Sequence, residues 1–166
     1  MLDSETPTGQ IYMEWEAVVA DTICQRKKCR QMLMSTPTSH SDRIFYREDD
    51  GDYPRILCIA EIKARNLSMS KLCGPPPYGD YIISNSKIIS GAQLSELLVV
   101  PFIIFVKLID SGEIVYWNIT DKHGEIQMDI PHWVSETKDT CNGGVARRDN
   151  AHLPLSHMHT LTGGAT

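Results

Sequence analysis

An almost unbroken apolar run at residues 56–62 constrains the fold of this chain more than any other feature of its sequence. A strand that is apolar at nearly every position is typical of a sheet that is covered on both faces. Two charged residues, Glu61 and Lys63, stand at the end of this run. They share one face of the strand because successive side chains alternate. Charges at the end of a buried strand are costly unless they have a task, so the sequence predicts a central strand that ends in functional groups.

A second strand is predicted at residues 43–47, and an acid-rich turn joins it to the apolar strand at residues 55–63. An antiparallel hairpin of these strands brings Asp42, at the start of the first strand, to the same sheet edge as Glu61, near the end of the other. Two convergent carboxylates suit Mg²⁺, which prefers oxygen ligands, and Lys63 beside them can stabilise charge at a phosphate. The hairpin therefore predicts a metal site next to a phosphate-binding site.

The order of Asp42 and then Glu61-x-Lys63 on the following strand resembles the motif of the PD-(D/E)xK nuclease superfamily. Farther along the chain, the segment 81–87, a helix and the apolar strand 100–106 look like the small phage and prophage members of that superfamily. The whole succession of elements, rather than the motif alone, carries the resemblance.

The resemblance covers about residues 10–120. One departure is Ser41, which stands where the superfamily motif has a proline before the aspartate. That proline is dispensable in the superfamily, so the departure leaves the chemistry intact. The resemblance implies a restriction-endonuclease-like α/β fold, with a mixed sheet core flanked by helices in a single domain. It also implies an endonuclease that uses Mg²⁺, for which Mn²⁺ can substitute, to hydrolyse phosphodiester bonds of DNA.

The same resemblance implies roles for the residues of the motif. Asp42 and Glu61 would bind the metal. The backbone carbonyl of Ile62 would be a further ligand because it lies between the two charged side chains. The metal would lower the pKa of a bound water and neutralise charge on the scissile phosphate. Lys63 would position the attacking hydroxide or stabilise the transition state, and hydrolysis would leave a 5′-phosphate.

A glutamate from the first helix often completes the sites of this superfamily. Helical spacing predicts that helix at residues 11–33, where Glu14 and Glu16 are the candidates. Glu16 is preferred because its stripe is apolar, whereas the stripe of Glu14 is more exposed. Lys87 lies on the inward stripe of a helix predicted at residues 86–98; the resemblance suggests that it contacts a phosphate, and a lysine that snorkels at the helix end is the alternative. The candidate catalytic residues are Glu16, Asp42, Glu61, Lys63 and Lys87.

Charge bears on the predicted partner, which is DNA. A net charge of −5 argues against a protein that coats nucleic acid through bulk electrostatics. It does not exclude a nuclease, because acids that bind a metal count as negative until the metal arrives. Three basic residues are candidate DNA contacts, although a solvated surface position is an equally good interpretation of each: Arg43, Arg65 and Lys71.

The length of the chain suits one domain with a real core. Residues 1–10 are predicted to be a flexible N-terminus, residues 11–160 the nuclease-like domain and residues 161–166 a flexible tail. The proline-rich segment 68–80 is predicted to be irregular, either as a loop that faces the substrate or as a plain connector. Other expected elements are a hairpin of strands at residues 101–108 and 114–119, a flexible segment at residues 141–144 and a final edge strand at residues 152–155.

No apolar run is long enough to span a bilayer, and the N-terminus lacks the basic and apolar regions of a signal peptide. The sequence therefore predicts a cytoplasmic protein of a bacterium or a phage-infected cell, with no membrane partner. The five cysteines are scattered and are predicted to be free thiols. His157 and His159 would share a strand face, but no acid or cysteine lies nearby in sequence to complete a metal site, so they are interpreted as incidental.

Two other hypotheses stay open beside the nuclease. The first is a non-catalytic nucleic-acid or protein-binding module on a nuclease-like fold, in which Asp42, Glu61 and Lys63 would be three costly charges without a task. The second is a structural role for Glu61 and Lys63 as ion-paired groups at a strand end. Within the nuclease class, phage DNA processing by a nicking, junction-resolving or restriction-type enzyme fits the sequence, and enzymes that cut both strands are expected as homodimers.

Overall fold

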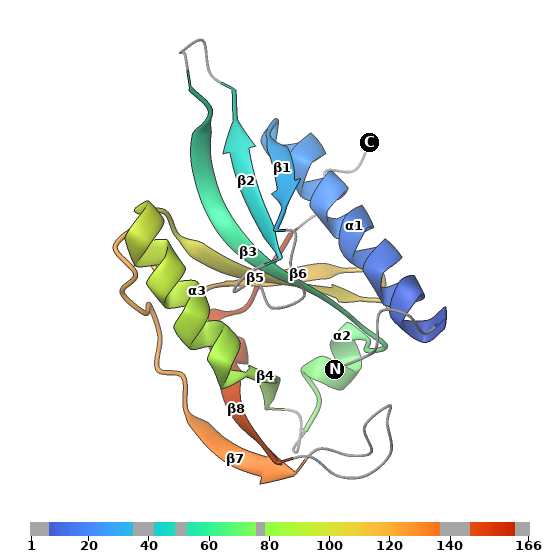
Figure 1. Cartoon of the computed structure of the whole chain (residues 1–166). Coiled ribbons are helices and arrows are strands. Elements are labelled where there is room, and N and C mark those ends of the chain that lie inside the picture. Colours follow the sequence, from blue (N-terminus) through green and yellow to red (C-terminus); the bar gives the residue numbers. More distant parts are fainter. Residues whose placement is uncertain (1–6, 35–41, 49–52, 76–78, 137–146, 162–166) are drawn as a thin grey trace.

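The computed structural model describes residues 7–34, 42–48, 53–75, 79–136 and 147–161 of the chain. Its larger sheet has six strands in the order β1-β2-β3-β5-β6-β9 (Figure 1). The pairing of β3 with β5 is parallel, and the other neighbours are antiparallel. The sheet is therefore mixed, as the sequence predicted. The strands of this sheet are β1 (Arg30–Leu33), β2 (Arg43–Arg47), β3 (Arg55–Arg65), β5 (Phe102–Leu108), β6 (Ile114–Asn118) and β9 (His159–Thr160).

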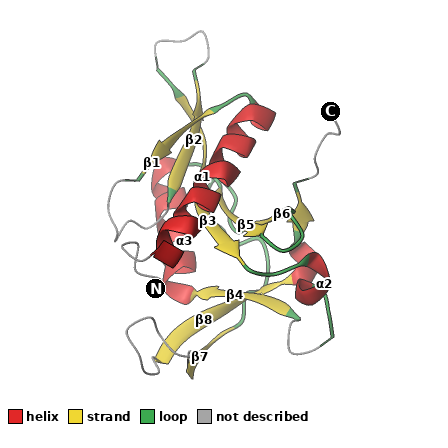
Figure 2. Cartoon of the chain, turned by 90° about the vertical axis from the view of Figure 1, so that its right-hand side faces the viewer, coloured by secondary structure: helices red, strands yellow, loops and turns green. Residues whose placement is uncertain are grey.

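A smaller antiparallel sheet has the order β4-β8-β7 and lies below the larger one in Figure 2. One long helix, α1, covers one face of the larger sheet, while α3 and the smaller sheet cover the other face (Figures 1 and 2). The predicted restriction-endonuclease-like α/β fold is confirmed. The remaining elements are α1 (Pro7–Lys27), α2 (Met69–Leu72), β4 (Asp80–Ser84), α3 (Asn85–Leu98), β7 (His132–Glu136), β8 (Arg147–Pro154) and a 3₁₀ helix at Leu155–His157.

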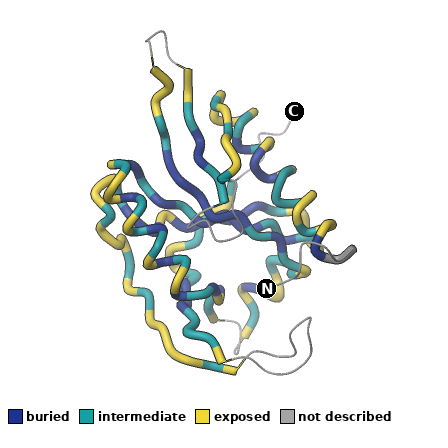
Figure 3. Tube along the Cα trace, in the orientation of Figure 1, coloured by how far each residue is buried: buried dark blue, intermediate teal, exposed yellow. Residues whose placement is uncertain are grey.

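Strand β3 is buried on both faces, which confirms the prediction from its apolar run. Ile59 packs into the core that α3 and the smaller sheet share. Ala60 and Ile62, on the opposite face, pack into the core beneath α1. Figure 3 shows buried positions gathered where β2 and β3 cross the centre of the molecule. The strand that carries the candidate site is thus held rigidly from both sides.

The hairpin of β2 and β3 sets the position of Asp42. Arg43 pairs with Ala60 in antiparallel register, and the backbone N–H of Asp42 donates to the carbonyl of Ala60 at 2.9 Å. Asp42 therefore comes level with Glu61, one position farther along β3. The predicted convergence of the two carboxylates at one edge of the hairpin is confirmed.

The first helix ends earlier than its sequence pattern predicts. The prediction of a helix over residues 11–33 is wrong at both ends, because α1 runs from Pro7 to Lys27. Lys28 then turns the chain with φ 49°, and residues 30–33 form β1, which pairs with β2. The free edge of β2 offers backbone donors and acceptors to any nearby strand, and this tertiary pairing outweighs the local helical preference of the segment.

Two other predicted segments differ from the structure. The segment 68–80 contains the short helix α2, whose first turn is capped when the hydroxyl of Ser68 accepts a hydrogen bond from the backbone N–H of Lys71 at 3.3 Å. The prediction that this segment is wholly irregular is therefore wrong at residues 69–72, and its residues 76–78 lie outside the described part. The segment 141–144, predicted to be flexible, also lies outside it.

The C-terminal part of the chain is more regular than predicted. Strand β8 lies between β4 and β7, so the prediction of an edge strand at residues 152–155 is wrong. Ala151 and Leu153 are fully buried in the main core. The N-terminal half of β8 is polar, so the sequence has no apolar alternation there that would predict a strand. His157 belongs to the 3₁₀ helix and His159 to β9, so these histidines do not share a strand face.

Helix α3 confirms the helix predicted at residues 86–98, with a start one residue earlier. It lies close against β5 because Gly91 carries no side chain, and the ring of Phe102 fills the space that a Cβ would occupy. This close packing holds the first turn of α3 over the end of β3. None of the described helices combines the length and the apolarity that crossing a membrane requires.

Candidate active site

Four separate parts of the fold bring the five candidate catalytic residues to one place. Asp42 lies just before β2, and Glu61 and Lys63 lie on β3. Glu16 comes from α1 and Lys87 from the first turn of α3. Ion pairs join all five side chains. The candidate residues predicted from the sequence therefore form one cluster.

Lys63 is at the centre of this cluster. Its Nζ lies 2.9 Å from Oε1 of Glu61 and 3.1 Å from Oδ2 of Asp42. Oε1 of Glu16 lies 3.8 Å away on a third side. One ammonium group is therefore surrounded by three carboxylates.

Lys87 approaches Glu61 from the opposite side. Its Nζ lies 3.0 Å from Oε2 of Glu61 and 4.0 Å from Oδ1 of Asp42. Each oxygen of the Glu61 carboxylate thus faces a different lysine. The inward position predicted for Lys87 is confirmed by this geometry, while its contact with a phosphate stays a prediction.

The Glu61 carboxylate is fully buried, and burial dominates its electrostatics. Burial raises the pKa of Glu61, and the nearby ammonium of Lys63 only partly offsets this effect. Burial likewise raises the pKa of Glu16, against the opposing effect of Lys63. For Lys63, burial by itself would lower the pKa, but the carboxylates of Glu61, Asp42 and Glu16 outweigh it and the pKa is raised. Lys63 is therefore a permanent cation between acids that burial makes harder to ionise.

Asp42 is held by the backbone as well as by lysine. The N–H of Ile62 donates to Oδ2 of Asp42 at 2.9 Å. In a strand, the N–H and carbonyl of one residue point to the same side, so the Ile62 carbonyl also faces the side of Asp42. This direction fits the ligand role that the resemblance implies for the Ile62 carbonyl.

The donor set of the cluster fits a hard divalent cation. Oxygen ligands from Asp42, Glu61 and the Ile62 carbonyl are of the type that Mg²⁺ and Mn²⁺ take. Oε1 of Glu61 is buried and close to Lys63 in an ion pair, but no donor in the described part of the chain is aligned to give it a hydrogen bond. Such an atom is an available acceptor for a cation. Among the described residues, no three acidic, histidine or cysteine side chains are already arranged around a common metal position.

The choice between the two helix glutamates follows the geometry. Glu16 reaches the cluster through its contact with Lys63, whereas Glu14 lies on the exposed side of α1. The preference for Glu16 from its apolar stripe therefore agrees with its position in the fold. Whether Glu16 acts in catalysis stays a prediction.

The three candidate DNA contacts lie in different surroundings. Arg43 points to the α1 face of β2, and its Nε is buried without a hydrogen-bond partner in the described part of the chain. Arg65 ends β3, and its positive charge slightly opposes the burial that raises the pKa of Glu16. Lys71 is exposed on α2 and lies 3.0 Å from Asp110. Lys71 is the most exposed of the three, and DNA binding by all three stays a prediction.

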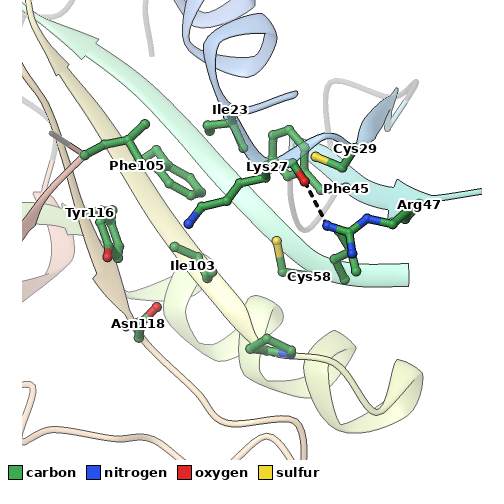
Figure 4. A pocket seen from close by; sticks show the side chains of 13 residues that line it. Ile23, Lys27, Cys29, Phe45, Arg47, Cys58, Ile103, Phe105, Tyr116 and Asn118 are labelled. Atoms are coloured by element: carbon green, nitrogen blue, oxygen red, sulfur yellow. Dashed lines mark hydrogen bonds between the residues drawn. The ribbon is translucent and has the colours of Figure 1, made fainter. Parts of the chain in front are cut away.

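A cavity of about 300 Å³ lies away from this cluster, between the end of α1 and the larger sheet (Figure 4). Its walls are mainly apolar, as at Ile23, Phe45 and Ile103, with Lys27 and Arg47 among them. No acidic residue is among the residues that line it. The cavity therefore lacks the groups that metal-dependent hydrolysis requires, and the carboxylate cluster is the candidate active site.

The thiols do not contribute to this site. Cys24, Cys29, Cys58 and Cys73 are free, as predicted, and Cys141 lies outside the described residues. Burial raises the pKa of Cys24 to about 11 and that of Cys58 to about 12. These two thiols are therefore protonated at neutral pH and poor nucleophiles.

Sequence reasoning missed two polar residues that connect α3, the helix of Lys87, to β8. Asn85, buried in the first turn of α3, donates from Nδ2 to Oδ2 of Asp149 on β8 at 2.7 Å. Asn85 could have been noticed in the sequence, because it is a polar residue at the start of a predicted helix, two positions before Lys87. Nothing local marks Asp149, because its partner is distant in sequence.

The comparisons with known proteins concern the family of the chain and not its single residues. A family model described as phage putative PDDEXK endonuclease matches residues 11–130. The matched region contains all five clustered residues. Searches of curated proteins and of solved structures found no match.

Proposed function

Because the chain belongs to the phage putative PDDEXK endonuclease family, we propose that it is a metal-dependent endonuclease that hydrolyses phosphodiester bonds of DNA. PD-(D/E)xK nucleases are generally dependent on a divalent metal. The observation that most strongly supports the proposal is the enclosure of Lys63 by the carboxylates of Glu61 and Asp42, with Glu16 on a third side. A plain structural ion pair needs one acid for one lysine, and here three acids meet two lysines, with Glu61 fully buried.

In this proposal, Asp42, Glu61 and the carbonyl of Ile62 hold Mg²⁺, for which Mn²⁺ can substitute. When bound, the ion lowers the pKa of a water and neutralises charge on the scissile phosphate. Glu16 contributes a further oxygen, directly or through water.

The two lysines have separate tasks. Lys63 pairs with Oε1 of Glu61 and Oδ2 of Asp42, and its ammonium would turn to the attacking oxygen and the phosphate if these carboxylates held a metal. Lys87, on the far side of Glu61, contacts a non-bridging phosphate oxygen. Arg65 and Lys71, with Arg43, contribute to binding of the DNA backbone.

We further propose that the enzyme processes DNA in the cytoplasm of a phage-infected or phage-carrying bacterial cell, since the family is a phage family. Cutting both strands of a duplex would require two sites. A symmetric homodimer is therefore the proposed form of an enzyme that makes double-strand breaks.

The test is cleavage of supercoiled plasmid, linear duplex, single strand and a four-way junction, each with Mg²⁺, Mn²⁺ or EDTA. The substitutions Asp42→Asn, Glu61→Gln and Lys63→Met are expected to lower cleavage by at least about a hundredfold while the fold is retained, since each removes a group at the reacting phosphate. Circular dichroism checks the fold. The matched control is Glu48→Gln, which removes an exposed carboxylate 2.8 Å from Arg30 and leaves cleavage unchanged.

Each outcome separates the hypotheses. Metal-dependent cutting that is lost in Glu61→Gln supports the nuclease, and the preferred DNA selects among nicking, junction-resolving and restriction-type activities. Cutting by Glu61→Gln at the wild-type rate would overturn the proposed mechanism. If the wild type cuts no substrate and binds neither Mg²⁺ nor Mn²⁺ in calorimetry, a binding module on a nuclease-like fold replaces the proposal.

A further inference from the structure

Strand β8 makes a side-chain contact with the helix that carries Lys87, although β8 lies beyond the region that the family model matches. Nδ2 of Asn85 donates to Oδ2 of Asp149 at 2.7 Å. The other oxygen of Asp149, Oδ1, lies 3.0 Å from Nδ1 of His132 on β7. The Asp149 carboxylate is thus bound on both oxygens, and it joins the central strand β8 and the outer strand β7 of the smaller sheet to the start of α3.

The contact between Asn85 and Asp149 lies at the N-terminus of α3. Asn85 is the first residue of α3 and is buried, and Lys87 is two residues later in the same turn. The Ser84 hydroxyl, at the N-cap position, caps no backbone N–H of the helix and lies 2.9 Å from the hydroxyl of Ser86 instead. The first turn of α3 therefore lacks the usual side-chain cap, and Asn85 attaches this turn to β8 through a side-chain hydrogen bond.

The charge of Asp149 suits this position. Hydrogen bonds from Asn85 and then from His132 lower the pKa of the Asp149 carboxyl, so it is ionised at neutral pH. An anion beside the first turn of a helix is stabilised by the positive end of the helix dipole. The backbone of β4 adds to the attachment, because Ser84 pairs with Asn150 of β8.

We propose that Asp149 is a positioning residue for Lys87. Through Asn85 it fixes the first turn of α3, and this places Nζ of Lys87 3.0 Å from Oε2 of Glu61. The matched region thus contains the lysine, while the segment after it contains the residue that orients the lysine. The catalytic consequence rests on the proposed nuclease function, but the placement of Lys87 does not.

The first experiment measures the placement in metal-free protein, without any cleavage assay. Lysines are labelled by reductive methylation, and mass spectrometry follows the rate at Lys87. Asp149→Ala and Asn85→Ala are expected to raise that rate about fivefold, which corresponds to roughly 1 kcal/mol, because Lys87 leaves its ion pair with Glu61. Asp149→Asn is expected to keep the wild-type rate, since its amide oxygen still accepts the hydrogen bond from Asn85.

The matched control is Asn150→Ala. Asn150 is the neighbour of Asp149 on β8 and donates to Ser135 within the smaller sheet at 2.7 Å. Its loss disturbs the sheet but not the bond to α3, so labelling of Lys87 stays at the wild-type rate. Glu61→Gln is the positive control, because it removes the acid that Lys87 contacts.

An unchanged Lys87 rate in both alanine variants, with a raised rate in Glu61→Gln, would overturn the proposal. Failure of both alanine variants to fold, judged by circular dichroism, would overturn it as well. In that case the Asn85–Asp149 bond would support the whole fold rather than Lys87.

The second experiment measures cleavage. Asp149→Ala is expected to lower kcat on the order of tenfold or more without raising KM, because a displaced catalytic group costs rate rather than binding. In the Lys87→Ala background, the same substitution causes no further loss. A further loss of similar size in that background would show that Asp149 acts independently of Lys87 and would overturn the catalytic part. If the wild type cuts no DNA, the proposed function fails, and the labelling result still decides the placement.

Discussion

At the scale of single residues, Glu61 is the clearest case of a group that the fold retains for a reason other than stability. Its carboxylate is fully buried between the ammonium groups of Lys63 and Lys87. Removing charges from water costs several kcal/mol per ion, and ion pairing at most balances that cost. A well-packed apolar side chain at position 61 would serve the core better, so the charge points to a task in binding or catalysis.

The raised pKa values of Glu61 and Glu16 predict how metal binding depends on pH. Burial raises both pKa values above the ordinary 4.5 of a glutamate, so each acid keeps its proton to a higher pH in the folded metal-free protein than in the unfolded chain. The stability that this contributes is present below pH 4.5 and is lost as the pH rises through the raised pKa values. Metal ligands must be deprotonated, so the affinity for Mn²⁺ is expected to fall as the pH is lowered, with the decline starting above pH 4.5.

Calorimetric titration of Mn²⁺ across a pH series measures this dependence. Glu61→Gln, which cannot ionise at position 61, is expected to bind the ion weakly at every pH. A wild-type affinity that declines only below pH 4.5 would contradict the raised pKa values.

At the scale of elements, the position of α3 depends on how closely it approaches the larger sheet. Gly91 faces Phe102 of β5, whose ring is fully buried against the helix backbone. Lys87 lies one turn before Gly91 on the same side of α3. The same close approach that packs the helix therefore also brings Lys87 down onto Glu61.

Gly91→Ala is expected to destabilise the protein by about 1–3 kcal/mol, because the new Cβ collides with the ring of Phe102 and the core has no space to accept it. Urea denaturation measures the change. The control is Gly79→Ala, where no atom lies within 4 Å of the added Cβ, and its effect is expected to stay within about 0.5 kcal/mol. A stabilised Gly91→Ala protein would mean that the gain in helix propensity outweighs the collision.

At the scale of the whole molecule, the C-terminal sheet belongs to the same core as the site. Leu153 of β8 is fully buried in one cluster with Val106 of β5 and Trp117 of β6. The indole Nε1 of Trp117 also donates to the carbonyl of Pro154 at 3.0 Å. The residues that follow the matched region are therefore part of the fold and not an appendage to it.

Leu153→Ala is expected to lower the free energy of unfolding by about 2–5 kcal/mol, because it leaves a cavity in this core. Denaturation followed by both fluorescence and circular dichroism is expected to show one cooperative transition at a lower midpoint. The control is Leu97→Ala on α3, where the side chain is 76% exposed and the change is expected to stay within about 0.5 kcal/mol. Two separate transitions would contradict a single core.

The central hairpin and the candidate site could be predicted from the sequence because their signals are local. The apolar run of β3 shows a strand buried on both faces, and the short connection from β2 allows only an antiparallel partner. Alternation along β3 then places Glu61 and Lys63 on one face. The antiparallel pairing brings Asp42 beside them at the start of β2. The inward position of Lys87 could also be predicted, because helical spacing places Lys87 and Gly91 on the same side of α3.

Only the tertiary structure decided the end of α1, the formation of β1, the central position of β8 and the bond between Asn85 and Asp149. The local sequence of residues 30–33 favours a helix, but pairing with the open edge of β2 makes them a strand. The polar half of β8 shows no apolar alternation, because its residues pair with β4 and β7 on either side. Each of these features depends on backbone and side-chain partners that are distant in the chain, and a local pattern carries no information about a partner that only folding brings near.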